Sequence, residues 1–209
     1  MKNEIELLLC CARTRLDSDT IKKIDSLVQR EIDWEILVQS ALIHRVMPLL
    51  YQNLQKTCPQ AVPRDTLEKL RTYFLTNTGR NLAFTTKLLE LIKLFKENGI
   101  TAIPFKGPVL AEFVYGDLAL RQFADLDILI YRDDVLNAYQ LLLSKGYRPE
   151  VSLNAEQVKA YLKTEYSLAA ADKDSKVIVE LHWEVTGRYT DYSFDLDHLE
   201  NRLETVTIS

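Results

Sequence analysis

The chain changes its hydrophobic spacing at Gly99, and this change divides its 209 residues into two unlike parts. Residues 1–98 contain one glycine, Gly79, and their apolar side chains recur at every third or fourth position, as on one face of an α-helix. A glycine is common just past a helix C-terminus, so Gly99 indicates where the last of these helices ends. We therefore predict a helical N-terminal region over residues 1–98 and a different architecture over residues 99–209.

Short β-type runs and helical segments alternate after Gly99. Bounded apolar runs predict strands at "ITAIPF", at "ADLDILIY" and in both arms of "EYSLAAADKDSKVIVELHWEV". Helical periodicity, or a proline in the first turn, predicts helices at "PVLAEFVYGD", "DDVLNAYQLLLSKG" and "AEQVKAYLKT". The final residues, "ENRLETVTIS", read as the beginning of a strand, so we expect the natural chain to continue beyond Ser209.

Composition excludes several classes of protein. Lys and Arg number 26 against 30 Asp and Glu, which leaves no basic excess for an extended nucleic-acid surface. No segment has the length of a membrane span, and the N-terminus is acidic where a signal peptide is basic, so we expect a cytoplasmic protein. The three cysteines, Cys10, Cys11 and Cys58, lack C-x-x-C spacing and predict buried free thiols rather than a disulfide framework or a zinc site.

The run "ADLDILIY" places Asp125 and Asp127 inside a predicted strand, although burying an ionised carboxylate is costly. Side chains alternate between the faces of a strand, so both aspartates point one way and the apolar residues between them point the other way. In "VIVELHWEV" the same alternation puts Val179, Leu181, Trp183 and Val185 on the core side and Glu180, His182 and Glu184 on the opposite face. Carboxylates gathered from two strands are costly unless cations neutralise them.

Divalent cations would neutralise such a set. Mg²⁺ prefers oxygen ligands and uses one or two protein carboxylates, while phosphates and waters complete its coordination. Two carboxylates on one strand and a third opposite suit two ions about 3.5–4 Å apart, the arrangement used for in-line phosphoryl-type displacement. Asp125, Asp127 and a third carboxylate from the second strand can therefore hold two Mg²⁺ ions as catalytic ligands, with Mn²⁺ as an alternative.

The residues that precede the acidic strand suit a triphosphate. Gly107 lets backbone N–H groups approach a phosphate, and a helix that starts near Pro108 directs its positive end to the same place. Lys106 and Arg121 add positive charge, and His182 shares the face of Glu180. Simpler readings stay open: the two aspartates can be solvated on an edge strand, Lys106 and Arg121 can pair with nearby aspartates, and His182 can be structural.

A set of short motifs in this region resembles a known family. The motifs are Lys-Gly, a short segment ending in Tyr-Gly-Asp, the pattern R-x-x-x-D-h-D-h-h-h with h apolar, and a later strand ending in Glu-Leu-His-Trp. Together they resemble the uncharacterised bacterial nucleotidyltransferase family of the DNA polymerase β-like superfamily. The likeness covers roughly residues 100–184, and "ALIHRVMPLLYQNL" is more weakly similar to the N-terminal region of that family.

The resemblance implies a fold, a site and a reaction. The fold is α+β, with a helical N-terminal region followed by a small mixed β-sheet flanked by helices. Asp125 and Asp127 become the paired metal ligands, Glu180 the third carboxylate and Gly107 the glycine of the phosphate turn. The reaction moves a nucleoside monophosphate from an NTP, for which we expect ATP, to an unknown acceptor hydroxyl and releases pyrophosphate.

Two departures from the superfamily pattern support a second hypothesis. The turn reads Lys106-Gly107-Pro108 and lacks the hydroxyl residue that usually follows the glycine, and Glu180 stands where an aspartate is more usual. A longer side chain shifts the carboxylate by about one methylene, and a misplacement of ~1 Å can cost catalysis ~10²-fold. The alternative is therefore a catalytically silent module that binds a nucleotide or a protein.

Two other enzyme classes that carry a D-x-D motif fit less well. Glycosyltransferases that use sugar nucleotides generally begin with a nucleotide-binding α/β unit, whereas the first hundred residues of this chain are helical in pattern. Phosphatases with an aspartyl nucleophile turn into a loop after the motif, whereas here Ile128-Leu129-Ile130 continues the strand.

Overall fold

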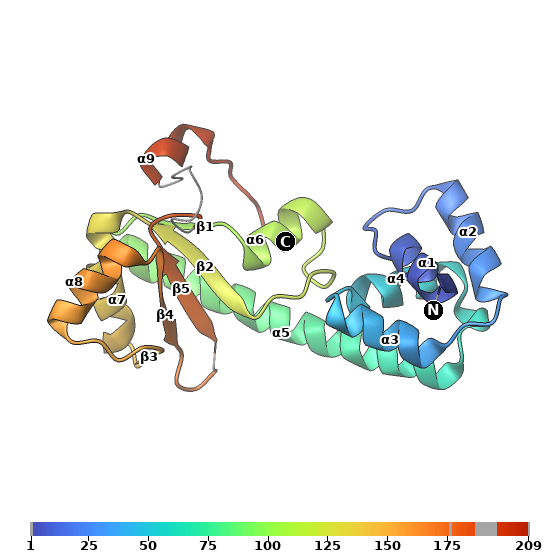
Figure 1. Ribbon diagram of the computed structural model, residues 1–209. Coiled ribbons are helices and arrows are strands. Elements are labelled where there is room, and N and C mark those ends of the chain that lie inside the picture. Colours follow the sequence, from blue (N-terminus) through green and yellow to red (C-terminus); the bar gives the residue numbers. More distant parts are fainter. Residues whose placement is uncertain (1, 176, 187–195, 209) are drawn as a thin grey trace. The chain divides into compact units, whose positions relative to one another are not determined.

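The computed structural model describes residues 2–175, 177–186 and 196–208, and its secondary structure is α+β, as predicted (Figure 1). The chain forms two compact units: Met1–Ala83 with Ala111–Gln122, and Phe84–Leu110 with Phe123–Ser209. The long helix α5, Arg64–Glu97, supplies residues to both units. Within the described ranges, no helix combines the length and the apolar character needed to cross a membrane.

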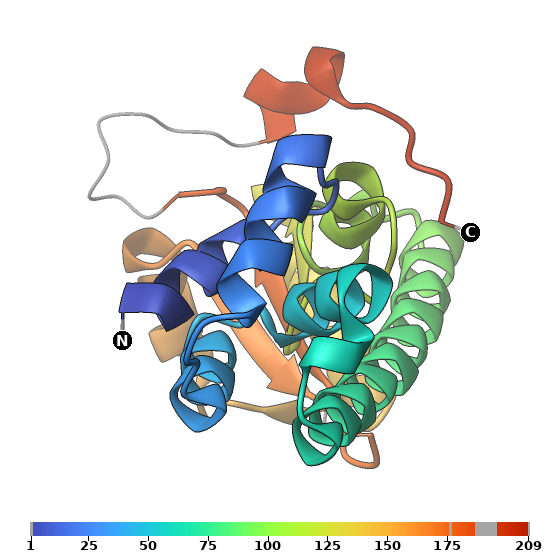
Figure 2. The same cartoon turned by 90° about the vertical axis from the view of Figure 1, so that its right-hand side faces the viewer.

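The first unit begins with four helices that pack against one another (Figure 2). Aspartates cap two of them: Asp17 accepts a hydrogen bond from the Thr20 amide at 2.7 Å, and Asp33 accepts from the Glu35 and Ile36 amides. The apolar stretch around His44 forms two helices rather than one. Arg45 takes a positive φ of 57°, which ends the first helix, and Pro48 lies in the first turn of the next. These helices are α1 (Lys2–Cys11), α2 (Ser18–Val28), α3 (Trp34–Ile43) and α4 (Met47–Thr57), and the 3₁₀ turn η1 (Pro59–Ala61) follows them.

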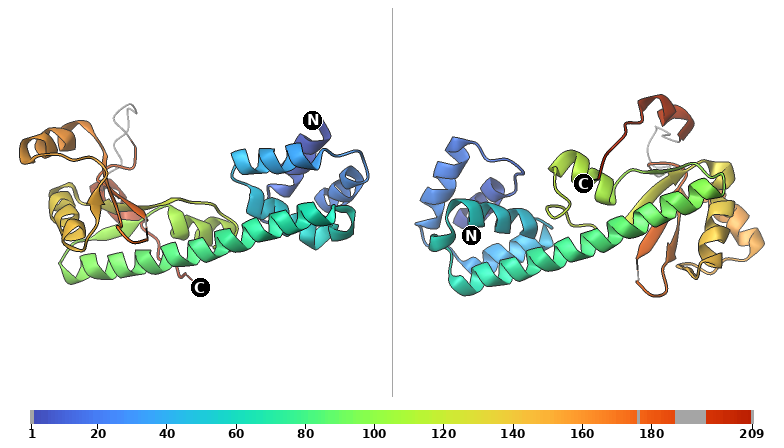
Figure 3. Two further views of the ribbon diagram at one scale, coloured as in Figure 1. Left: turned by 90° about the horizontal axis from the view of Figure 1, so that it is seen from below. Right: turned by 180° about the vertical axis from the view of Figure 1, so that it is seen from behind.

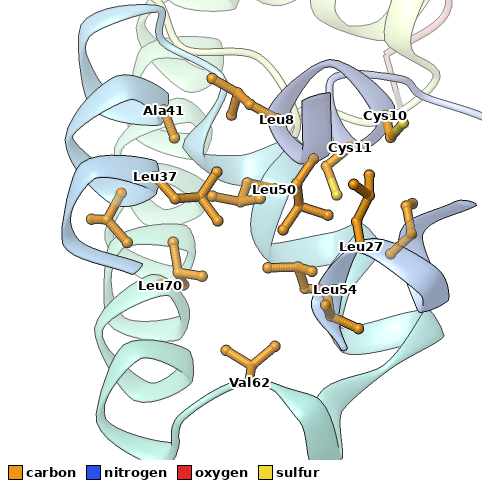
Figure 4. Close-up of a cluster of buried hydrophobic side chains, with 14 of the residues drawn as sticks. Leu8, Cys10, Cys11, Leu27, Leu37, Ala41, Leu50, Leu54, Val62 and Leu70 are labelled. Atoms are coloured by element: carbon orange, nitrogen blue, oxygen red, sulfur yellow. The ribbon is translucent and has the colours of Figure 1, made fainter. Parts of the chain in front are cut away.

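An apolar cluster fills the centre of this unit (Figure 4). Side chains from α1, α2, α3, α4 and the start of α5 meet there, and Leu37, Leu50 and Leu54 are fully buried. Cys10, Cys11 and Cys58 are free and buried, as predicted, and burial raises the pKa of the Cys11 and Cys58 thiols. These thiols therefore act as small hydrophobic side chains.

Two asparagines on α5 hold the segment that leads toward the acidic strand. Asn77 donates to the Ala119 carbonyl at 2.9 Å, and Asn81, one turn later, donates to the Leu118 carbonyl at 2.6 Å. Both side chains also donate to the carbonyl of Arg121, at 3.3 and 2.7 Å. Because both asparagines are buried, these bonds fix the backbone of the segment against the helix.

The second unit is built on a five-stranded mixed sheet with the order β1-β2-β5-β4-β3. Its central pair, β2 (Asp125–Ile130) and β5 (Ile178–His182), is parallel, and the other pairs are antiparallel. The remaining strands are β1 (Ala102–Pro104), β3 (Arg148–Pro149) and β4 (Ser167–Ala171). The helices of this unit are α6 (Gly107–Leu110), the turn η3 (Arg132–Asp134), α7 (Val135–Ser144), α8 (Ala155–Thr164), α9 (Leu196–Leu199) and η4 (Glu200–Arg202).

The observed elements correct two of the sequence predictions. "PVLAEFVYGD" forms the short helix α6 followed by a π-helical turn, η2 (Ala111–Tyr115). The strand predicted at "ENRLETVTIS" is wrong, because η4 occupies its beginning and residues 203–208 carry neither helix nor strand. A strand needs a hydrogen-bonded neighbour, and no strand of the described chain pairs with these residues. The two-residue strand β3 was too short to predict.

Candidate metal centre

The parallel pair at the centre of the sheet brings the predicted acidic residues together. The register places Asp127 beside Glu180, and Leu129 beside His182. β2 is an inner strand, so the reading of Asp127 as a solvated carboxylate on an edge strand is wrong. Leu126, Ile128 and Ile130 are fully buried, which confirms the packing face, and only 5% of Asp127 is exposed on the other face.

Asp127, Glu180 and His182 form a compact cluster. Their ligand atoms all lie within 4.8 Å of one another. The Nε2 atom of His182 is 3.0 Å from Oδ1 of Asp127 and 3.2 Å from Oε2 of Glu180. Because two carboxylates face this one nitrogen, Nε2 carries a proton and donates to them. His182 therefore holds the two carboxylates together.

Charge in the cluster is set by burial and by hydrogen bonds that act in opposite directions. Burial alone would lower the pKa of His182, but hydrogen bonds to Asp127 and Glu180 outweigh it and raise this pKa above its ordinary value. Burial alone would raise the pKa of Asp127, but hydrogen bonds from His182 and Lys106 outweigh it and lower this pKa. Asp127 is therefore ionised at neutral pH, as a metal ligand must be.

Lys106 reaches the cluster from the end of β1. The amide of Phe105 donates to the Asp127 carbonyl at 3.4 Å and extends the ladder, which sets the next residue beside the acidic strand. Lys106 Nζ lies 2.8 Å from Oδ1 of Asp127 and 4.9 Å from the centre of the Phe105 ring. The structure thus pairs Lys106 with an aspartate, the reading that the sequence left open, and its contact with phosphate stays a prediction.

Gly107 follows directly and occupies a position that favours glycine. Its φ is +50°, and a Cβ added there would lie 3.4 Å from the backbone oxygen of Asp125. The glycine therefore allows the start of α6 to run close against β2, and the approach of its backbone to a phosphate stays a prediction.

Two predicted residues lie outside the compact cluster. Asp125 begins β2 and shares the strand face of Asp127, but the ligand atoms within 4.8 Å of one another belong to Asp127, Glu180 and His182. Arg121 belongs to the other compact unit, where its carbonyl accepts the asparagine hydrogen bonds described above. Metal binding by Asp125 and phosphate binding by Arg121 stay predictions.

The sequence did not single out the aromatic rings beside His182. The Phe105 ring meets the imidazole edge-on with centroids 5.1 Å apart, and the Tyr166 ring lies 5.9 Å away. Phe105 adjoins Lys106 in the sequence. Tyr166 directly precedes β4, and the pairing of β4 with β5 brings it beside His182. The two predicted strands of that hairpin were therefore the sequence signal that could have identified Tyr166. These rings fix the orientation of a histidine that is only 2% exposed.

The side chains at the cluster differ in how far they are exposed. The side chains of Glu180 and Lys106 are 31% and 43% exposed, whereas that of Asp127 is 4% exposed.

A separate cavity of about 500 Å³ lies beyond the carboxyl ends of β2 and β5, and its lining includes Tyr131, Arg132, Asp133, Trp183, Glu184 and Leu196. Glu184 there faces Arg132 at 3.8 Å and takes no part in the cluster.

The donor atoms of the cluster suit a divalent cation. Asp127 and Glu180 supply the carboxylate oxygens that Mg²⁺ prefers, and His182 would offer a nitrogen compatible with Mn²⁺ or Zn²⁺ once Nε2 has lost its proton. Lys106 and His182 contribute the positive charge that balances the carboxylates beside them. The residues therefore fit a metal site, while the identity and number of the ions belong to the proposal below.

A family model described as "uncharacterised nucleotidyltransferase" matches residues 30–209. The chain belongs to this family. The match confirms the resemblance seen in the sequence and extends it beyond residues 100–184 to most of the helical region. A search of curated proteins gave no match. Membership indicates a nucleotidyltransferase, and it implies a nucleoside triphosphate as the substrate.

Proposed function

We propose that this protein is a metal-dependent nucleotidyltransferase that moves a nucleoside monophosphate from ATP to an acceptor hydroxyl and releases pyrophosphate. The observation that carries the proposal is the pairing of Asp127 with Glu180 across two parallel strands, with His182 between them. The family match supports the same class of reaction.

Asp127 and Glu180 would hold divalent cations, and Asp125 would join them from the same strand face. We propose two Mg²⁺ ions, with Mn²⁺ as a substitute. When bound, such ions lower the pKa of the acceptor hydroxyl and stabilise charge on the α-phosphate and the departing pyrophosphate.

The remaining residues bind and orient the triphosphate in this proposal. Lys106 is partly exposed on a flexible side chain, so its ammonium can turn from Asp127 to a phosphate oxygen. Gly107 lets the backbone of the turn approach the phosphates, and Arg121 adds a guanidinium that can bind two oxygens at once. His182 keeps the two carboxylates aimed at a common point.

A second candidate function is nucleotide or protein binding without catalysis. The observation that favours it is that Lys106 and His182 already balance the charge of Asp127 within the chain. The turn also lacks the hydroxyl group that the wider superfamily provides for phosphate. The enzyme and a silent nucleotide-binding module both require the acidic cluster to bind a nucleotide, and they differ in whether a bond is broken; a protein-binding module has no such requirement.

The test compares Asp127→Asn with a matched control, Asp174→Asn, at an exposed position in the turn between β4 and β5. Asparagine keeps the shape of the side chain and removes its charge. We expect wild type and the control to bind ATP in titration calorimetry only with Mg²⁺ or Mn²⁺. For Asp127→Asn we expect binding weakened by more than about 100-fold, since changes to groups that merely support metal ligands cost about 10–100-fold.

Transfer is measured separately with ATP labelled on the α-phosphate and fractions of a cell extract as acceptors. Labelled product and pyrophosphate that depend on metal and on Asp127 support the enzyme. Metal-dependent binding with no release across the fractions favours the silent module. Full metal-dependent binding by a folded Asp127→Asn protein would show that the proposed centre is wrong.

A further inference from the structure

The outer face of α5 carries a row of exposed leucines spaced by seven residues. Leu75, Leu82 and Leu89 are 53%, 53% and 57% exposed. They stand on one uninterrupted helix of 34 residues, so their alignment follows from helix geometry (Figure 3). A seven-residue repeat of large apolar side chains is typical of a helix that packs along another helix.

Small residues separate these leucines along the same face. Thr72, Gly79 and Thr86 are exposed and lie three or four positions from the nearest leucines. Gly79 gives the strongest indication of an external contact, because a Cβ added there would have no atom within 4 Å. Glycine weakens a helix interior relative to alanine, and no neighbour among the described residues packs closely enough to require it at this position. A helix packed closely from outside would require it.

Pairing this face with the same face of a second copy, antiparallel, matches every large residue to a small one. With the midpoint between Arg80 and Asn81, Leu82 of one copy lies opposite Gly79 of the other. The same register sets Leu75 opposite Thr86 and Leu89 opposite Thr72. Each leucine therefore packs over a small residue of the other helix, as large side chains do in packed helix pairs.

The same antiparallel register also places opposite charges across from each other at the two ends of the face. Glu68 lies opposite Lys93, and Asp65 lies opposite Lys96. The side chains of Glu68 and Lys93 are 62% and 77% exposed, and their partners within the helix, Arg71 at 3.7 Å and Glu97 at 3.8 Å, form only exposed surface pairs. A parallel arrangement would instead set Glu68 against Glu68 and Lys93 against Lys93, so the charges select the antiparallel pair.

We propose that the outer face of α5, defined by Asp65, Glu68, Thr72, Leu75, Gly79, Leu82, Thr86, Leu89, Lys93 and Lys96, is a homodimer interface. Two copies pair antiparallel about a two-fold axis, so each contact occurs twice. The contact consists of one helix from each copy, and we expect a dimer of micromolar stability. This inference does not depend on the proposed function.

Sedimentation equilibrium tests the proposal over protein concentrations from about 1 to 500 µM, which span a micromolar dissociation constant. Wild type should form dimers, and Leu82→Glu should be monomeric throughout. Leu9→Glu, at a leucine of α1 that is 65% exposed and outside the face, should dimerise like wild type. Circular dichroism checks that each variant is folded.

Charge reversal tests the register. Glu68→Lys and Lys93→Glu should each weaken the dimer about tenfold or more, because each change places like charges opposite one another twice. The double variant should recover the wild-type dissociation constant, since it restores opposite charges. A wild type that stays monomeric to the highest concentration, or a double variant as weak as either single one, would overturn the proposal.

Discussion

The core of the helical unit and the centre of the sheet are buried to a similar degree but contain opposite kinds of residue. The cluster around Leu50 consists of leucines, valines, cysteines and other apolar side chains. The sheet centre buries Asp127 and His182 between apolar strands, with Glu180 and Lys106 at its edge. Apolar burial stabilises a fold directly, whereas buried charge is retained only where partners or ligands balance it. The comparison separates the region that stabilises the protein from the region proposed to carry its chemistry.

The largest stability effect is expected in the helical core. Leu50→Ala should lower the free energy of unfolding by about 2–5 kcal/mol, because it removes a fully buried side chain and leaves a cavity. Urea denaturation measures the change. Leu9→Ala, at an exposed leucine, should change it by less than about 0.5 kcal/mol. Loss of metal-dependent ATP binding by the folded Leu50→Ala protein would contradict the comparison, because the helical core would then contribute to the proposed chemistry as well as to stability.

A pair of glycine substitutions should give effects of opposite sign. Gly107→Ala should destabilise by about 1–2 kcal/mol, because a side chain at φ +50° is strained and its Cβ approaches the Asp125 carbonyl. Gly79→Ala should stabilise the monomer by about 0.5–1 kcal/mol, because the added methyl has open space in a helix interior. Denaturation at low protein concentration measures both, and equal effects would contradict the role given to the Gly107 turn.

The smallest expected effect concerns acid stability near the sheet. Hydrogen bonds from the amides of Ser175 and Asp174 hold Asp172, and Lys87 lies 3.5 Å from its carboxylate. Burial alone would raise the pKa of Asp172, but these hydrogen bonds lower it below its ordinary value. Its contribution to stability is therefore full above the unfolded-state pKa of about 3.9 and is lost as the pH falls through the lower, folded-state pKa.

We expect Asp172→Ala to lose about 1 kcal/mol at neutral pH and to show a shallower loss of stability than wild type below about pH 4. Asp174→Ala, in the same turn but exposed, is the control and should follow the wild-type curve. Parallel acid curves for wild type and Asp172→Ala would show that this carboxylate contributes nothing to acid stability.

The two regions also differ in how far the sequence predicted them. Helical periodicity and glycine placement located the helices well, and α5 ends at Glu97 just before Gly99, which has a φ of +73°. Strand alternation predicted that Asp127 and Glu180 each lie opposite the packed face of their own strand, and the buried apolar residues on both sides of each one confirm it. Each of these features follows from short-range spacing, which a sequence displays directly.

Contacts between distant segments could not be derived in this way. The sequence placed His182 on the right face but could not tell that its Nε2 atom lies between two carboxylates. The pairing of Lys106 with Asp127 depends on the antiparallel β1–β2 ladder, and spacing within one strand does not predict its neighbour. The strand expected near the C-terminus failed for the same reason, since propensity alone supplies no partner.

The acidic cluster depends on the alignment of β5, which follows β4 through a hydrogen-bonded turn. The Asp172 amide donates to the Val177 carbonyl at 2.9 Å in this hairpin, and the register of β5 along β2 places Glu180 beside Asp127. A slip of β5 by one residue along β2 would exchange the faces of the strand and present Val179 and Leu181 where Glu180 and His182 now stand; the burial of both apolar side chains opposes it. The same apolar side chains that fill the core therefore keep the proposed ligands on the open face of the sheet.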